Sequence, residues 1–165
     1  MAIDTLRRAA HFVALCLAQA LVFNHVHLFG YATVLLYVYF VVIFPRSYPR
    51  WAILLWSFAL GLSVDMFTNT PGMAAAALTL VGFLQPYLLE LFLPRDAAEN
   101  IKSSVSALGF TRFLTLASIL VFVHCLVFFT IESFGFFNWL EWLLTIGGTT
   151  LLTLVLLITI ETVRR

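Results

Sequence analysis

Charged side chains are scarce in this sequence. Only 10% of the 165 residues are Asp, Glu, Lys or Arg, whereas 62% are hydrophobic and the mean hydropathy is +1.04. Soluble domains carry about 25% charged residues, so the composition excludes a water-soluble enzyme. The net charge of +1, with 9 basic residues spread along the chain, also gives no basic patch that would bind nucleic acid.

Catalytic and metal-binding motifs are also absent from the sequence. It contains no Walker loop, no Gly-rich dinucleotide turn, no His or Cys cluster with metal-ligand spacing and no nucleophile with a matching base. The two cysteines, Cys16 and Cys125, lie in apolar runs and are expected to be buried as small hydrophobic residues. We therefore expect a protein that is not an enzyme and that uses no cofactor and no metal.

Long apolar runs dominate what is present. Strands of a membrane β-barrel alternate between apolar and polar residues, but Val34 to Phe44 and Leu151 to Ile160 are apolar on every face. Such runs indicate helices in lipid, each of which needs about 20 residues to span a membrane. The sequence predicts an all-α, polytopic membrane helix bundle that occupies residues 1–165 as a single transmembrane domain.

Polar residues, Pro and Gly divide the chain into about six apolar segments. The predicted transmembrane helices lie at about 9–23, 28–44, 51–67, 72–93, 113–131 and 142–163. As an alternative for the first segment, Arg7, Arg8 and a small-residue site at Ala18 to Ala20 are also typical of a cleavable signal peptide. We expect the segment to be retained because its apolar run continues to Phe23.

The basic residues predict the orientation of these helices. All 9 fall on one side of a six-span arrangement, and the loops on the other side contain none. They are Arg7, Arg8, Arg46, Arg50, Arg95, Lys102, Arg112, Arg164 and Arg165. Because cytoplasmic loops are enriched in Lys and Arg, both termini and the loop at 94–112 are expected in the cytoplasm.

That loop has an amphipathic pattern of its own. Ala97, Ile101, Val105 and Leu108 would share one face of a helix. A short helix lying on the membrane surface is one interpretation, and a docking surface for a cytoplasmic partner is the other.

Small residues mark the face on which the third segment packs. Ser57, Gly61 and Asp65 recur every four residues, which places them on one side of a helix where a neighbouring backbone can approach closely. Asp65 then has two interpretations. It contributes to a site or partner contact near the outer end, or it is a structural residue that reaches to the nearby membrane interface or caps backbone N–H groups around Thr70, Pro71 and Gly72.

His124 lies near the middle of the fifth segment. A proton relay at this depth would need partners, and the available ones are Gln19, Gln85 and hydroxyl groups. The other interpretation is a neutral histidine that is hydrogen-bonded between helices.

Residues Gly61 to Gly72 read GLSVDMFTNTPG, and an alanine-rich helix follows up to Leu84. This segment resembles the bacterial rod shape-determining protein family MreD, whose members are similar in length, in number of spans and in lacking a soluble domain. Gly72 follows Pro71 directly here, whereas many members have an apolar residue between them.

The resemblance implies a non-enzymatic inner-membrane scaffold of the cell-elongation machinery that synthesises peptidoglycan. Its partner would be a single-span MreC-like protein and, indirectly, MreB, RodA and penicillin-binding protein 2. The candidate helix-packing or partner face consists of Ser57, Gly61, Asp65, Pro71 and Gly72. We expect Gly61→Leu to weaken partner association because it would block close approach of a helix.

An alternative function is that of a substrate-binding membrane subunit of a vitamin transporter. Ala10, Ala14 and Ala18 would dock an energising module, and Asp65, Asn69 and Trp139 would line a ligand pocket near the outer face.

Overall fold

A computed structural model describes residues 2–21, 27–28, 32–98, 101, 103–134 and 138–164. Two very short strands and seven helices cover most of these residues. The elements are α1 (Ala2–Leu21), β1 (His27–Leu28), β2 (Ala32–Thr33), α2 (Val38–Val42), α3 (Arg50–Thr68), α4 (Met73–Phe92), α5 (Val105–Leu108), α6 (Phe110–Glu132) and α7 (Trp139–Arg164).

Four helices, α3, α4, α6 and α7, are long and apolar enough to cross a membrane. They contain 19 to 26 residues each and coincide with the last four predicted segments to within a few residues at each end. The chain is therefore a multi-pass membrane protein built from helices.

The first predicted segment forms α1, which contains 20 residues but starts earlier than expected. Its first two turns include Asp4, Arg7 and Arg8. This charged start distinguishes α1 from the four helices that are long and apolar enough to cross a membrane, although α1 packs on α3. The last residues of the predicted segment, 22–23, lie outside the described part of the chain.

The prediction of a continuous transmembrane helix over 28–44 is wrong. β1 and β2 pair antiparallel, the chain then runs without regular structure to α2, and α2 has only 5 residues. Every residue from Val34 to Val42 is buried. The segment is apolar on all sides because protein surrounds it, and lipid contact is not the reason.

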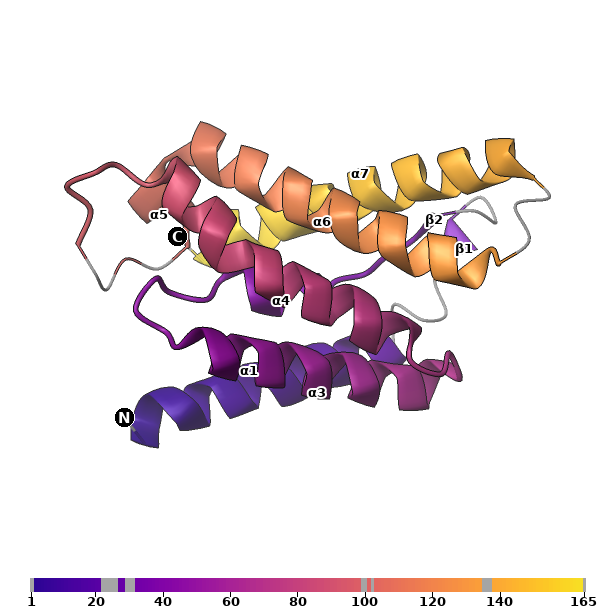
Figure 1. Ribbon diagram of the computed structural model, residues 1–165, viewed down its shortest axis with the longest axis horizontal. Coiled ribbons are helices and arrows are strands. Elements are labelled where there is room, and N and C mark those ends of the chain that lie inside the picture. Colours follow the sequence, from indigo (N-terminus) through magenta and orange to yellow (C-terminus); the bar gives the residue numbers. More distant parts are fainter. Residues whose placement is uncertain are drawn as a thin grey trace.

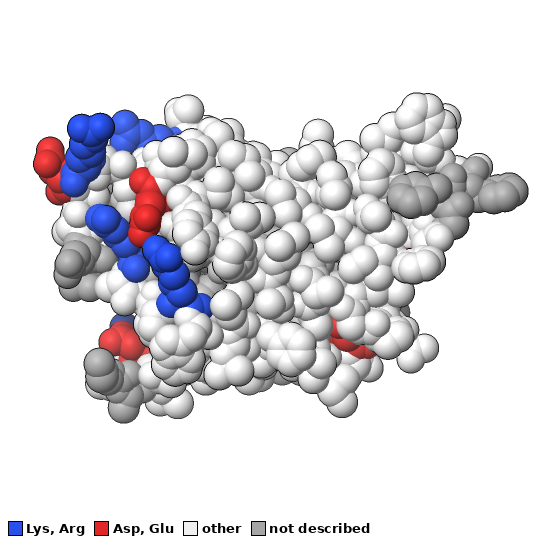
Figure 2. Space-filling model, viewed as in Figure 1, with Lys and Arg blue, Asp and Glu red and all other residues white. Residues whose placement is uncertain are grey.

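Figure 1 shows this segment threading between two groups of helices, with α1 and α3 below and α6 and α7 above. Within the bundle, α3 packs on α4, α4 on α6 and α6 on α7. Figure 1 also places the N-terminal end of α1 and the C-terminal end of α7 at the same end of the molecule. The Lys and Arg side chains visible in Figure 2 gather at that end, and a broad uncharged belt separates them from the other end.

Between α4 and α6 the described residues contain one short helix, α5, and the last residues of the predicted loop, 110–112, already belong to α6. The predicted amphipathic helix therefore forms in its second half alone, because Ala97 and Ile101 lie outside any helix. The loop folds back on the chain, since the Arg46 backbone N–H donates to the Ile101 carbonyl at 3.1 Å.

Candidate functional site

Asp65 joins the end of α3 to the start of α4. Its Oδ1 accepts hydrogen bonds from the Ala74 N–H and the Thr70 hydroxyl, each at 2.9 Å, and its Oδ2 accepts one from the Ala75 N–H at 2.9 Å. The first turn of a helix has N–H groups without partners inside that helix, and a carboxylate there also interacts favourably with the helix dipole. Asp65 thus caps α4, as the second of its two interpretations expects.

Gly61 and Ser57 lie one and two turns before Asp65 on the same face of α3. A Cβ atom added at Gly61 would lie 2.5 Å from the Ala75 Cα and 2.7 Å from the Ala74 carbonyl oxygen. A Cβ at Gly82 of α4 would likewise meet the Ser57 hydroxyl. These positions allow the backbones of α3 and α4 to approach closely, so the face is occupied by a helix of this chain.

Pro71 and Gly72 form the exposed turn between the two helices. Gly72 has φ 79°, a left-handed conformation that suits glycine. The structure therefore places three of the five predicted site residues along the α3–α4 interface, where Ser57 faces Gly82 further along α4, and the other two in the turn. A partner helix would have to displace α4 to reach Gly61 or Asp65.

A second group of polar side chains, on α1 and α7, holds the non-helical segment after β2. The Gln19 side chain donates to the Val34 carbonyl at 2.7 Å and accepts from the Leu36 N–H at 3.0 Å. The hydroxyl of Thr153 accepts from the Leu35 N–H at 3.2 Å. Backbone outside regular structure is tolerated at membrane depth only where protein satisfies its polar groups, and these side chains do so here.

Sequence reasoning missed this role. The threonine series on α7 has helical spacing, and Gln19 is a rare polar residue in an apolar run. Those were the available signals, but neither identifies the backbone group that the side chain will bond. The Thr149 hydroxyl, for example, accepts from the Thr33 N–H at 3.3 Å, although the two residues are more than a hundred positions apart.

Two tyrosines, Tyr37 just before α2 and Tyr39 within it, connect this part of the chain to α6 and α7. The Tyr37 hydroxyl and His124 Nε2 are 2.9 Å apart, and both side chains are fully buried. Tyr39 donates to Glu161 Oε2 at 2.6 Å and accepts from Arg164 at 3.2 Å. His124 is thus hydrogen-bonded between elements, as its second interpretation expects.

A cavity of about 320 Å³ lies near the end of the molecule away from the termini. Its polar walls include Thr33, Thr68, Thr70 and Glu132, and its aromatic walls include Tyr37. The residues predicted to line an outer pocket do not line this one. Asp65 is committed to α4, while Asn69 and Trp139 are exposed.

Among the residues that the structure describes, no group of three or more His, Cys, Asp or Glu side chains is placed to hold a metal ion. Comparisons of the chain with protein-family models, curated proteins and solved structures find no match.

Proposed function

We propose that this protein is a non-enzymatic scaffold subunit of the bacterial inner membrane, of the MreD type, which binds the transmembrane helix of a single-span MreC-like partner. Through that partner it serves the cell-elongation machinery of MreB, RodA and penicillin-binding protein 2. The choice of family comes from the resemblance at Gly61 to Gly72, and the binding role is supported by the way in which the bundle uses its polar side chains and by an open surface on α7.

The buried polar groups hold the fold. Asp65 caps α4, Gln19 bonds the backbone at Val34 and Leu36, and Glu161 accepts from the Tyr39 hydroxyl and from a backbone N–H of α5 at 3.2 Å. A catalytic group needs access to its substrate. These side chains instead form hydrogen bonds within the protein. Their use supports a protein that acts by binding.

The exposed face of α7 is the best candidate for the partner helix. Only 22% of the most apolar stretch of α7 is buried inside the molecule, compared with 39% to 44% for the other three apolar helices. Gly147 lies on this face between the exposed Leu144 and Leu151, and nothing lies within 4 Å of where its Cβ would be. Helices in lipid associate where a small residue lets two backbones approach. The open surface at Gly147 is the observation that carries the proposal.

The test is a pull-down of the tagged chain from its native membrane in mild detergent, with the bound proteins identified by mass spectrometry. We expect the wild-type chain to recover a single-span partner and wall synthases. Gly147→Leu should reduce that recovery at least tenfold. Ala76→Leu, the same kind of enlargement on the exposed face of α4, should leave it unchanged.

Equal recovery by Gly147→Leu and wild type, at equal expression, would move the partner to another surface. Absence of any single-span partner from the wild-type sample would overturn the scaffold proposal itself.

The cavity near Thr68 and Glu132 favours one other candidate, the substrate-binding subunit of a vitamin transporter. Its mixture of hydroxyl, carboxylate and aromatic walls is typical of small-molecule sites. Thermal stabilisation of the purified chain by a water-soluble vitamin would support this function if Thr68→Trp, which fills the cavity, abolished it. Met66→Trp on the exposed face of α3 is the matched control. Loss of rod shape on depletion would favour the scaffold instead.

A further inference from the structure

A cationic pocket lies at the end of the molecule that holds both termini. It has a volume of about 140 Å³, and its charged walls are Arg7, Arg8 and Arg164, with His11 beside them and Asp4 as the one carboxylate. In the described part of the chain, none of these three arginines forms an ion pair. The pocket therefore carries an excess of positive charge, between the N-terminal end of α1 and the C-terminal end of α7.

Neighbouring groups hold two of the three arginine side chains, Arg8 and Arg164, while the bond at Arg7 is made by its backbone carbonyl. The Arg8 guanidinium lies 3.9 Å from the centre of the Tyr48 ring, and Arg164 donates to the Tyr39 hydroxyl at 3.2 Å. His11 Nδ1 donates to the Arg7 carbonyl at 2.8 Å. Arginines held in this way are preorganised to bind a phosphate or carboxylate with several hydrogen bonds.

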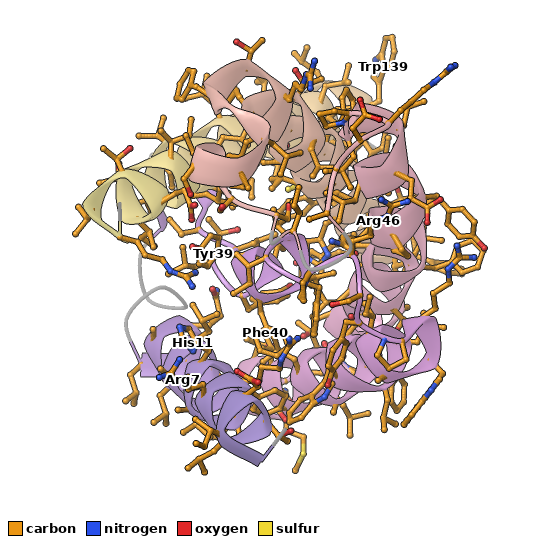
Figure 3. All side chains as sticks on the ribbon, turned by 90° about the vertical axis from the view of Figure 1, so that its left-hand side faces the viewer. Arg7, His11, Tyr39, Phe40, Arg46 and Trp139 are labelled. Atoms are coloured by element: carbon orange, nitrogen blue, oxygen red, sulfur yellow. The ribbon has the colours of Figure 1, made fainter. Side chains whose placement is uncertain are left out.

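An apolar groove continues from this pocket between α1 and α7. It has a volume of about 430 Å³, and Ala14, Leu15, Ile160 and Val163 contribute walls that are almost wholly apolar. His11 and Arg164 line both the groove and the cationic pocket, so the two are adjacent. Figure 3, viewed from this end, shows Arg7 and His11 on α1 across a gap from Tyr39.

We propose that the cationic pocket and the groove together form a binding site for an anionic phospholipid. Its phosphate lies among Arg7, Arg8 and Arg164, and an acyl chain lies in the groove between α1 and α7. Basic pockets between helices at a membrane surface bind lipid headgroups in this way. A free phosphate would explain the arginines but would leave the adjoining groove unfilled, which is why the structure favours a lipid. The site is independent of the partner face on α7.

The headgroup half of the proposal is tested with the full-length chain in detergent and phosphatidylglycerol that carries a fluorescent tail. We expect it to bind at least tenfold more tightly than phosphatidylcholine with the same tail. The double variant Arg7→Gln/Arg164→Gln should weaken binding about tenfold or more. The control Arg95→Gln/Arg112→Gln removes the same charge from exposed positions in and next to the 94–109 loop and should have little effect. Equal loss in both double variants would overturn the site.

The tail half is tested by filling the groove. Ala14→Trp should weaken phosphatidylglycerol binding at least fivefold, whereas Val13→Trp, an exposed neighbour outside the groove, should not. Glycerol phosphate, which has no tail, should fail to displace the lipid at equal concentration. Displacement by glycerol phosphate, together with unchanged binding in Ala14→Trp, would show a site for soluble phosphates and overturn the lipid proposal. Equal binding of phosphatidylcholine would overturn it as well.

Discussion

The α3–α4 pair and the chain from Val34 to Phe44 are both strongly apolar, but only the second is almost wholly buried, and the two satisfy their backbones differently. In α3 and α4 almost all N–H groups find carbonyls within the same helix, and Asp65 supplies acceptors for the turn that lacks them. Between Val34 and Leu36 the partners come from other helices, through Gln19 of α1 and Thr153 of α7, whereas N–H groups from Val38 onwards bond to carbonyls of the same segment.

An apolar run therefore does not by itself specify a helix in a membrane protein. A helix is required where lipid surrounds the backbone, because lipid offers no hydrogen bonds. Where polar side chains of neighbouring helices converge on a segment, an extended backbone is tolerated at the same depth. We therefore expect the stability of the α3–α4 contact to depend on side-chain volume. The stability of the segment from Val34 to Phe44 should depend instead on individual polar side chains that bond its backbone.

The largest effect is expected at Gly61. Gly61→Ala places a Cβ 2.5 Å from the Ala75 Cα and should lower the free energy of unfolding by about 3 kcal/mol, the upper part of the range for overpacking. Gly147→Ala makes the same change where nothing lies within 4 Å and should be neutral or slightly stabilising. Unfolding in mixed micelles by detergent titration measures both. Equal stability of the two variants would show that α3 and α4 are not in close contact.

An intermediate effect is expected at Gln19. Gln19→Leu leaves the Val34 carbonyl and the Leu36 N–H without partners. It should cost about 2 kcal/mol, since each buried orphan group costs about 1–3 kcal/mol and water relieves part of this. Leu17→Ala on the exposed face of α1 serves as the control in the same titration. A cost no greater than that of the control would mean that Gln19 does not support the segment.

The smallest effect is expected at Thr153. Thr153→Val keeps the shape of the side chain and removes the acceptor for the Leu35 N–H, at a cost of about 1 kcal/mol. Thr162→Val on the same helix removes a hydroxyl that only donates to the Ile158 carbonyl at 2.7 Å, and it should change stability little. Equal losses of stability in thermal unfolding would mean that the Thr153 hydroxyl does not support the Leu35 N–H.

Sequence predicted the parts of the fold that depend on local patterns. The bounds of α3, α4, α6 and α7 follow from apolar runs that end at polar residues, Pro or Gly, and the spacing of Ser57, Gly61 and Asp65 identified a packing face. Asp65 was predictable as a cap because its partners lie within ten residues. These features require only neighbours along the chain.

The rest depended on contacts between distant residues. The segment after Ala32 reads as a helix in lipid because composition does not distinguish burial by protein from burial by lipid. The hydroxyl of Thr153 is 118 residues away from the Leu35 N–H to which it bonds. The cationic pocket likewise needs both ends of the chain to meet, since Arg7 and Arg164 are at opposite ends of the sequence.

Backbone hydrogen exchange at residues 33–37 would show whether side chains of α1 and α7 hold the backbone of this segment. The wild-type chain is compared in detergent with the double variant Gln19→Leu/Thr153→Val by mass spectrometry of overlapping peptides. We predict that the Leu35 and Leu36 amides exchange at least tenfold faster in the double variant, because their acceptors are side chains of α1 and α7. Amides in the middle of α4 should be unaffected. Unchanged protection at Leu35 and Leu36 would contradict the account, because a helix making its own backbone bonds would behave in that way.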